Sequence, residues 1–152
     1  MITIERTKNE HIRFVSARLR KGDKLELEHA GRKDYQAAVK ESVAVSPFAF
    51  TALHNGVPMC LFGLRPDGLL SRRARVWLLG TGEINTTKKD FVRTCRTVVD
   101  GLLDIYPELY NAVDDGYPQA KRLLQFLGAR FTRKVFAKTG KPFILFEIRR
   151  NQ

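Results

Sequence analysis

The chain has 152 residues, which is the length of one domain, so a single domain over residues 1–152 is expected. Its composition, 43% hydrophobic and 28% charged, is that of a globular protein and excludes an intrinsically disordered chain. Lysine and arginine number 27 against 16 acidic residues, and this net charge of +11 favours anionic partners such as nucleic acid or acidic protein surfaces. No apolar run approaches the ~20 residues of a membrane-spanning helix, so no membrane span is expected.

The first residues of the chain predict a strand and a helix. Apolar and polar residues alternate over 2–6, which is typical of a half-buried strand. Apolar residues then recur at helical spacing, in a helix that Thr7 or Asn9 caps and that ends at or just before Gly22. The charged stretch 23–33 has no clear periodicity, and its structure is left open.

A second helix and a hairpin follow. The helix begins at Asp34 and stops at Pro47, because proline cannot continue it. Residues 48–53 then predict a strand, and the Asn-Gly pair within 54–57 is the strongest short signal for a two-residue hairpin turn. The return strand over 58–64 is nearly all apolar, which predicts a central strand that is buried on both faces.

The rest of the chain alternates between strands and helices. After a basic, exposed link at 71–75, the expected elements are a strand at 76–79, a long helix ending at Pro107, a strand at 109–113, a helix from Pro118 to Gly128, and strands at 130–137 and 143–149. The resulting order, β-α-α-β-β-β-α-β-α-β-β, predicts a mixed sheet with helices on both faces.

This order of elements, over nearly the whole chain, resembles the GNAT superfamily, the N-acyltransferases that use acetyl-CoA. Residues 120–127, followed by Gly128 and Phe131, are similar to the fourth-helix signature of that superfamily, which ends in Leu-Gly-Phe. The resemblance implies an α/β fold with a mixed, mostly antiparallel central sheet and helices on both of its faces.

A narrower resemblance is to small internal virion or virion-assembly proteins of podovirus-type phages. The segments that carry it are 59–63, 76–80, Tyr106-Pro107 with Asn111 and Asp114, and 121–128. This resemblance implies other phage virion proteins as partners and a location in the host cytoplasm or the virion interior. The first six residues contain no apolar region of a signal peptide, which is consistent with that location.

The GNAT resemblance also implies where acetyl-CoA would bind. In the superfamily, the pantetheine arm pairs with the edge of the strand that here ends at Leu79, and the next loop holds the pyrophosphate at a helix start. The corresponding residues are Leu78, Leu79, Gly80, Gly82, Asn85, Thr86, Thr87, Lys88 and Lys89. Asn85 and Thr87 replace two glycines of the superfamily pattern. Lys88 and Lys89 oppose the helix dipole unless an anion lies nearby, although solvated surface lysines are the alternative.

The catalytic residues of the superfamily are matched less well in this chain than its cofactor-binding segments. Many GNAT members protonate the leaving thiolate with a tyrosine whose position here is Leu124, and leucine cannot transfer a proton. Tyr117, two turns earlier, is expected to point elsewhere, so Tyr110 is the candidate substitute. Glu83 and Asp114 are the candidate bases. Packing at a strand edge is the alternative for Tyr110, and a turn is the alternative for Asp114.

We therefore expect a GNAT-fold phage protein that has lost catalysis, has no cofactor and acts in virion assembly by binding virion proteins or DNA. The alternative is an active N-acetyltransferase that uses acetyl-CoA to modify an amine of a protein or a small molecule. A third class is a nucleic-acid-binding module. It would gather the basic residues Arg72, Arg73, Arg75, Lys88, Lys89, Arg93 and Arg96. Cys60 and Cys95 are expected to be buried free thiols, and no metal site is expected because the histidines lack ligand spacing.

Overall fold

The computed structural model describes residues 1–150. Its elements are β1 (Ile2–Arg6), α1 (Asn9–Ser16), α2 (Lys21–His29), α3 (Tyr35–Ala44), β2 (Phe48–His54), β3 (Val57–Pro66), β4 (Arg73–Gly80), the 3-10 helix η1 (Gly82–Thr86), α4 (Lys88–Ile105), β5 (Glu108–Asp114), α5 (Pro118–Phe126), β6 (Arg130–Phe136) and β7 (Pro142–Arg149). The hairpin turn has the expected residues, with Asn55 at φ 51° and Gly56 at φ 83°, the backbone that the Asn-Gly signal favours.

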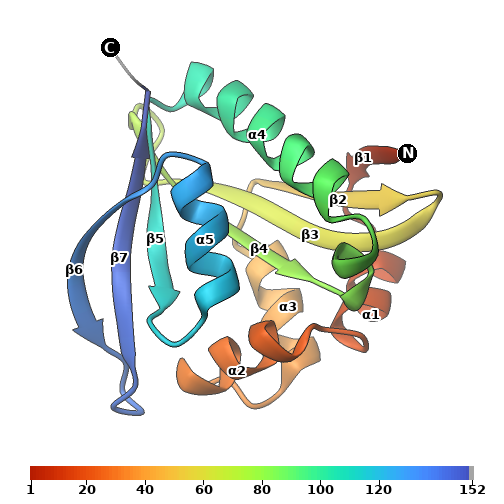
Figure 1. Ribbon diagram of the computed structural model, residues 1–152, viewed down its shortest axis with the longest axis horizontal. Coiled ribbons are helices and arrows are strands. Elements are labelled where there is room, and N and C mark those ends of the chain that lie inside the picture. Colours follow the sequence, from red (N-terminus) through yellow and green to blue (C-terminus); the bar gives the residue numbers. More distant parts are fainter. Residues whose placement is uncertain (151–152) are drawn as a thin grey trace.

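The strands form one sheet in the order β1-β2-β3-β4-β5-β7-β6 (Figure 1). All neighbours are antiparallel except β4 and β5, which run parallel. Helices α1, α2 and α3 lie on one face, where Val15 and Val39 pack against Leu61 of the central strand β3. Helices α4 and α5 cover the other face. The expected mixed, mostly antiparallel sheet with helices on both faces is confirmed.

The region around Gly22 differs from the prediction. Helix α1 already ends at Ser16, and Gly22 lies in the first turn of an additional helix, α2, which occupies most of the stretch left open. A Cβ atom at Gly22 would lie 2.3 Å from the ring of Tyr117, so the glycine permits close packing of α2 against α5. From the sequence alone, a glycine that makes room for a residue far along the chain cannot be distinguished from a glycine that ends a helix.

Strand β4 begins three residues earlier than predicted. Arg73 and Arg75 belong to the strand, where they are exposed, and only the first part of the basic stretch is a link. The sequence masks this start because two arginines in alternate positions are compatible with either a loop or an uncovered strand face. Among residues 1–150, no helix has the length and apolar character needed to cross a membrane.

Candidate active site between strands β4 and β5

Strands β4 and β5 pair at one end only and then diverge (Figure 1). Their register covers three pairs, from Arg73–Glu108 to Arg75–Tyr110. Directly beyond the last pair, the Asn111 side chain spans the gap, and its Nδ2 donates a hydrogen bond to the Val76 carbonyl at 2.7 Å. Farther along, the gap holds a cavity of about 220 Å³. The cavity therefore borders the strand ending near Leu79 to which the GNAT resemblance assigns the cofactor arm.

The edge of β4 presents backbone groups to this cavity. The Val76 carbonyl and both backbone groups of Gly80 point away from β3, since they bond to Asn111, Asp23 and Arg20. Alternation in an antiparallel pair then directs the N–H and C=O of Leu78 to the same edge. Leu78 lines the cavity, so an extended chain that carries amides could pair with it as an additional strand.

Helix α2 forms one wall of the cavity and is fixed there by a buried carboxylate. Asp23 is 2% exposed and accepts hydrogen bonds from Gly80 N at 2.7 Å and from Tyr117 OH at 2.8 Å. Its two oxygens also accept from the Arg20 guanidinium, each at 3.1 Å. A buried charge is stable only when it is paired in this way, so Asp23 holds α2, β4 and α5 in fixed positions around the cavity.

Glu26, one turn farther along α2, is the titratable group that lines the cavity with a neutral-range pKa. Its Oε2 accepts a hydrogen bond from Asp114 N at 2.9 Å. The pKa of Glu26 is raised to about 7, mainly by burial. The Asp114 N–H bond and Arg20 oppose this rise, and the carboxylates of Asp23 and Asp114 contribute to it. A carboxyl group with this pKa can accept and release a proton at neutral pH. Sequence reasoning missed it because stretch 23–33 shows no pattern.

Tyr117 is the second residue that the sequence misplaced. Contrary to the expectation, its side chain lines the cavity, while its hydroxyl donates to Asp23. Burial, followed by the charge of Asp23, raises the pKa of the Tyr117 phenol, which therefore keeps its proton. Leu124, the position of the usual tyrosine, also lines the cavity. No signal in the sequence distinguishes Tyr117 from a tyrosine that faces solvent.

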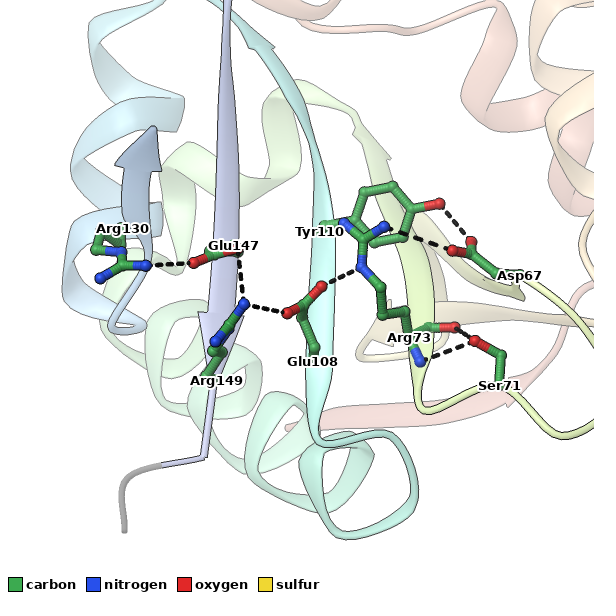
Figure 2. Close-up of polar contacts among 8 residues, drawn as sticks. All are labelled: Asp67, Ser71, Arg73, Glu108, Tyr110, Arg130, Glu147 and Arg149. Atoms are coloured by element: carbon green, nitrogen blue, oxygen red, sulfur yellow. Dashed lines mark hydrogen bonds and ion pairs between the residues drawn. The ribbon is translucent and has the colours of Figure 1, made fainter. Parts of the chain in front are cut away.

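The three candidate catalytic residues from the sequence lie at three separate places. Tyr110 lies outside the cavity, at the closed end of the strand pair, where its hydroxyl donates to Asp67 and Arg73 lies over its ring (Figure 2). Glu83 contacts His54 Nδ1 at 3.0 Å, and hydrogen bonds from His54 and Thr86 lower its pKa. Asp114 is buried, with Oδ2 at 2.5 Å from the Nδ1 of His29.

The loop after β4 differs from a glycine-rich cradle. Gly82, Asn85 and Thr86 lie in η1, whose first turn is capped by the Thr81 side chain. Lys88 and Lys89 are exposed in the first turn of α4, where they were expected, together with Asp90. Thr87 makes no side-chain cap at the start of this helix, so the first amides of α4 remain available to an anion.

A second cavity lies on the α4 side of the same opening. It measures about 150 Å³, is enclosed by apolar side chains of α4 and α5, and shares Val76, Leu78 and Leu124 with the first cavity. The free thiols of Cys60 and Cys95 also line it. Cys60 is buried, as expected, whereas Cys95 is only partly buried, and desolvation raises the pKa of Cys95 to about 12. The first cavity is lined in part by α2 and the second in part by α4, and both border Val76 and Leu78 of β4. The residues present thus fit an elongated cofactor with an amide-bearing arm.

The basic residues do not gather on one surface. Arg73 and Arg75 share a face of β4 with Trp77, which packs with the α1 and α3 side of the sheet. Lys88 and Lys89 begin α4, which packs on the opposite face. The single basic patch that a nucleic-acid-binding module would need is therefore divided between the two faces.

The divided sheet, the cavity and the helices on both faces define the fold of the GNAT acetyltransferases. No protein family and no curated protein matches the sequence. Solved structures do match: a chimera built in part from the Vibrio cholerae spermidine N-acetyltransferase has a TM-score of 0.72 at 15% identity, over 97% of this chain and 95% of that one. The Escherichia coli ribosomal-protein-S18-alanine N-acetyltransferase has a TM-score of 0.69 at 13% identity, over 100% and 96%.

A GNAT-family acetyltransferase from Bacillus anthracis has a TM-score of 0.71 at 7% identity, over 97% of this chain and 94% of that one. At such identities the likeness establishes the fold and leaves the activity to the residues of this chain. The comparisons give no support to the narrower resemblance to phage virion proteins, so that role stays a prediction.

Proposed function

We propose that the protein is an N-acetyltransferase, which transfers an acetyl group from acetyl-CoA to an amine. The observation that carries this proposal is the cavity at the diverging strands β4 and β5, with Glu26 on its wall. The fold of the neighbouring structures supports it, since several of them are named as acetyltransferases. Of the two roles considered from the sequence, the proposal favours the active N-acetyltransferase over a protein that acts only by binding.

Three parts of the chain would hold the cofactor. The backbone of Leu78 would pair with amides of the pantetheine arm, and the apolar cavity under α4 would accommodate its methylene groups. Lys88 and Lys89, with the first amides of α4, would lie near the pyrophosphate. The missing glycines of the loop leave fewer backbone N–H groups for the phosphates, so we expect weaker binding than a complete cradle would give.

Glu26 is the side chain that would transfer protons in the reaction. Bound acetyl-CoA would supply the acetyl group as a reactive thioester. Glu26, with a pKa of about 7, would accept the proton that the acceptor amine loses as its nitrogen attacks. Protonated Glu26 or solvent would then supply the proton that the departing sulfur takes up, because the Tyr117 hydroxyl keeps its own proton in the hydrogen bond to Asp23.

Calorimetry with coenzyme A, together with a thiol-release assay on a panel of amines, tests the proposal. We expect binding and turnover in the wild type, and a loss of turnover of about 10²-fold or more with retained binding in Glu26→Gln. Glu28→Gln, an exposed position on the same helix, serves as the matched control and should keep both. Absence of both binding and turnover would contradict the proposal and favour the binding role.

A further inference from the structure

Part of the sheet face that carries α1, α2 and α3 is left uncovered. Trp77 and Leu79 of β4 pack with the helical layer, but Arg73 and Arg75, earlier on the same side of the strand, are exposed. Figure 2 shows that side chains of β5, β6 and β7 continue this surface. We call it the open face, and its arginines are Arg65, Arg73, Arg75, Arg130 and Arg149.

Acidic residues alternate with arginines over much of the open face. Glu147 contacts Arg130 at 2.8 Å and Arg149 at 3.5 Å (Figure 2). Glu108 in turn contacts Arg149 at 2.7 Å and also binds Arg73. Three of the five arginines are therefore neutralised, at least in part, by carboxylates of this chain. A continuous phosphate backbone placed here would be repelled by the interleaved acids.

Arg65 and Arg75 are the exception on this surface. They lie directly opposite each other on β3 and β4, so both side chains project from the same face. The ion pairs among residues 1–150 include neither of them, and both are exposed. Like charges in directly opposite positions are unfavourable unless an anion lies between them. An anion bound at this pair would relieve the repulsion between the two guanidinium groups.

The arginine pair is adjacent to the proposed active site. Arg75 Nη1 donates to Asn111 Oδ1 at 3.2 Å, and Asn111 lines the cavity that contains Glu26. A molecule bound to Arg65 and Arg75 would therefore lie beside Asn111, at the end of the cavity where β4 and β5 close together. The net charge of +11 also favours an acidic ligand, because it attracts acidic molecules and repels a polycationic acceptor.

We infer that the acceptor amine belongs to an acidic peptide segment, whose carboxylates bind Arg65 and Arg75 while the amine reaches Glu26. This inference rests on the proposed N-acetyltransferase function and names its substrate class. An extended peptide matches the surface because it carries separated carboxylates, in contrast to the closely spaced charges of a nucleic acid.

The test uses peptides of one length with a free N-terminal amine and Glu, Gln or Lys at the next three positions. Acetyl transfer is measured by thiol release, and binding is measured separately by fluorescence anisotropy of a labelled, N-terminally blocked version of each. We expect kcat/KM to be roughly tenfold higher for the Glu peptide than for the Gln peptide. This factor corresponds to the combined free energy of two exposed ion pairs. The Lys peptide should be the poorest substrate.

Two double variants at exposed residues, with one control, test whether the preference for acidic peptides arises from the open face. Arg65→Gln with Arg75→Gln should abolish it, and Arg65→Glu with Arg75→Glu should invert it in favour of the Lys peptide, which a general loss of structure cannot do. Arg13→Gln, an exposed arginine on α1, removes the same type of charge and should leave the preference intact.

The outcomes separate the inference from the function on which it rests. Equal transfer to all peptides would overturn the acidic acceptor and leave the acetyltransferase in place. Arg65- and Arg75-dependent binding of the blocked acidic peptide, without transfer to any amine, would overturn the acetyltransferase and support the peptide site. Stronger competition for this site by a short DNA duplex of equal charge would overturn the peptide in favour of nucleic acid.

Discussion

Asp23 in α2 and Gly80 at the end of β4 are joined by a hydrogen bond of 2.7 Å between the Asp23 carboxylate and the Gly80 N–H. The two residues are 57 positions apart in the chain, and the same carboxylate also accepts bonds from Arg20 and Tyr117. This one side chain therefore connects three elements that surround the cavity. It also occupies the last backbone donor of the β4 edge, which limits strand addition to the region of Leu78.

Replacement of Asp23 should destabilise the protein strongly. Asp23→Ala leaves the Arg20 guanidinium, largely buried, without its partner, and the expected loss is about 3–5 kcal/mol in the free energy of unfolding. Chemical denaturation followed by circular dichroism measures it. The control is Asp34→Ala, which removes an exposed helix cap at α3 and should cost about 1 kcal/mol. A loss as small in Asp23→Ala as in Asp34→Ala would show that the hydrogen bonds of Asp23 contribute little to the free energy of unfolding.

The activity should depend on the protonation of Glu26. As a base, Glu26 acts in its ionised form, so kcat/KM should rise with pH and reach half of its plateau near pH 7. In Glu26→Gln, the remaining activity should lose this inflection. The measurement is a pH–rate profile at saturating coenzyme, and an inflection that persists in the variant would assign the base to another group.

The same pKa shift affects stability in the opposite direction. Because the folded-state pKa of about 7 exceeds the ordinary value of 4.5, the folded state binds more protons than the unfolded state between these two values. The contribution of Glu26 to stability is therefore fully present below pH 4.5 and is lost as the pH rises through 7, by at most about 3 kcal/mol. Glu26→Gln should flatten the measured stability over this interval, and an unchanged slope would contradict the shift.

Gly63 should be intolerant of any side chain. A Cβ atom there would lie 2.4 Å from the Trp77 ring, whose Nε1 donates to Ser46 at 2.8 Å. Gly63→Ala must displace the indole and should lower the free energy of unfolding by about 1–3 kcal/mol. Gly101→Ala in α4 is the control, since its Cβ would meet no atom within 4 Å, and it should stabilise by about 0.5–1 kcal/mol. Equal effects would indicate that the indole moves freely.

Lys88 and Lys89 should show opposite effects on stability and on coenzyme binding. Lys88→Glu with Lys89→Glu places acids at the positive end of α4, which should raise the free energy of unfolding by several tenths of a kcal/mol per residue. The affinity for coenzyme A, measured by calorimetry, should fall because the pyrophosphate loses two cations. Lys33→Glu with Lys40→Glu makes the same charge change on exposed positions at α3 and should leave the affinity intact.

Some features of the site were predictable from the sequence, and others were not. The strand over 76–79 and the long helix after it follow from local periodicity, and the family resemblance adds the prediction that a cofactor would bind between them. The extra helix α2 could not, because its only buried residue is the charged Asp23 and its apolar pattern is weak. The groups with the clearest chemistry at the cavity, on Glu26 and Tyr117, therefore escaped prediction.

The amino-acid sequence by itself determined the order of the strands and of the α-helices other than α2, because alternation and helical spacing are properties of neighbouring residues. The tertiary structure alone decided which side chains meet at the cavity. Glu26 contacts a residue 88 positions away, and Tyr117 contacts one 94 positions away. Burial at such distant contacts sets the pKa of Glu26, and burial depends on how whole elements pack rather than on the residues beside it in the chain.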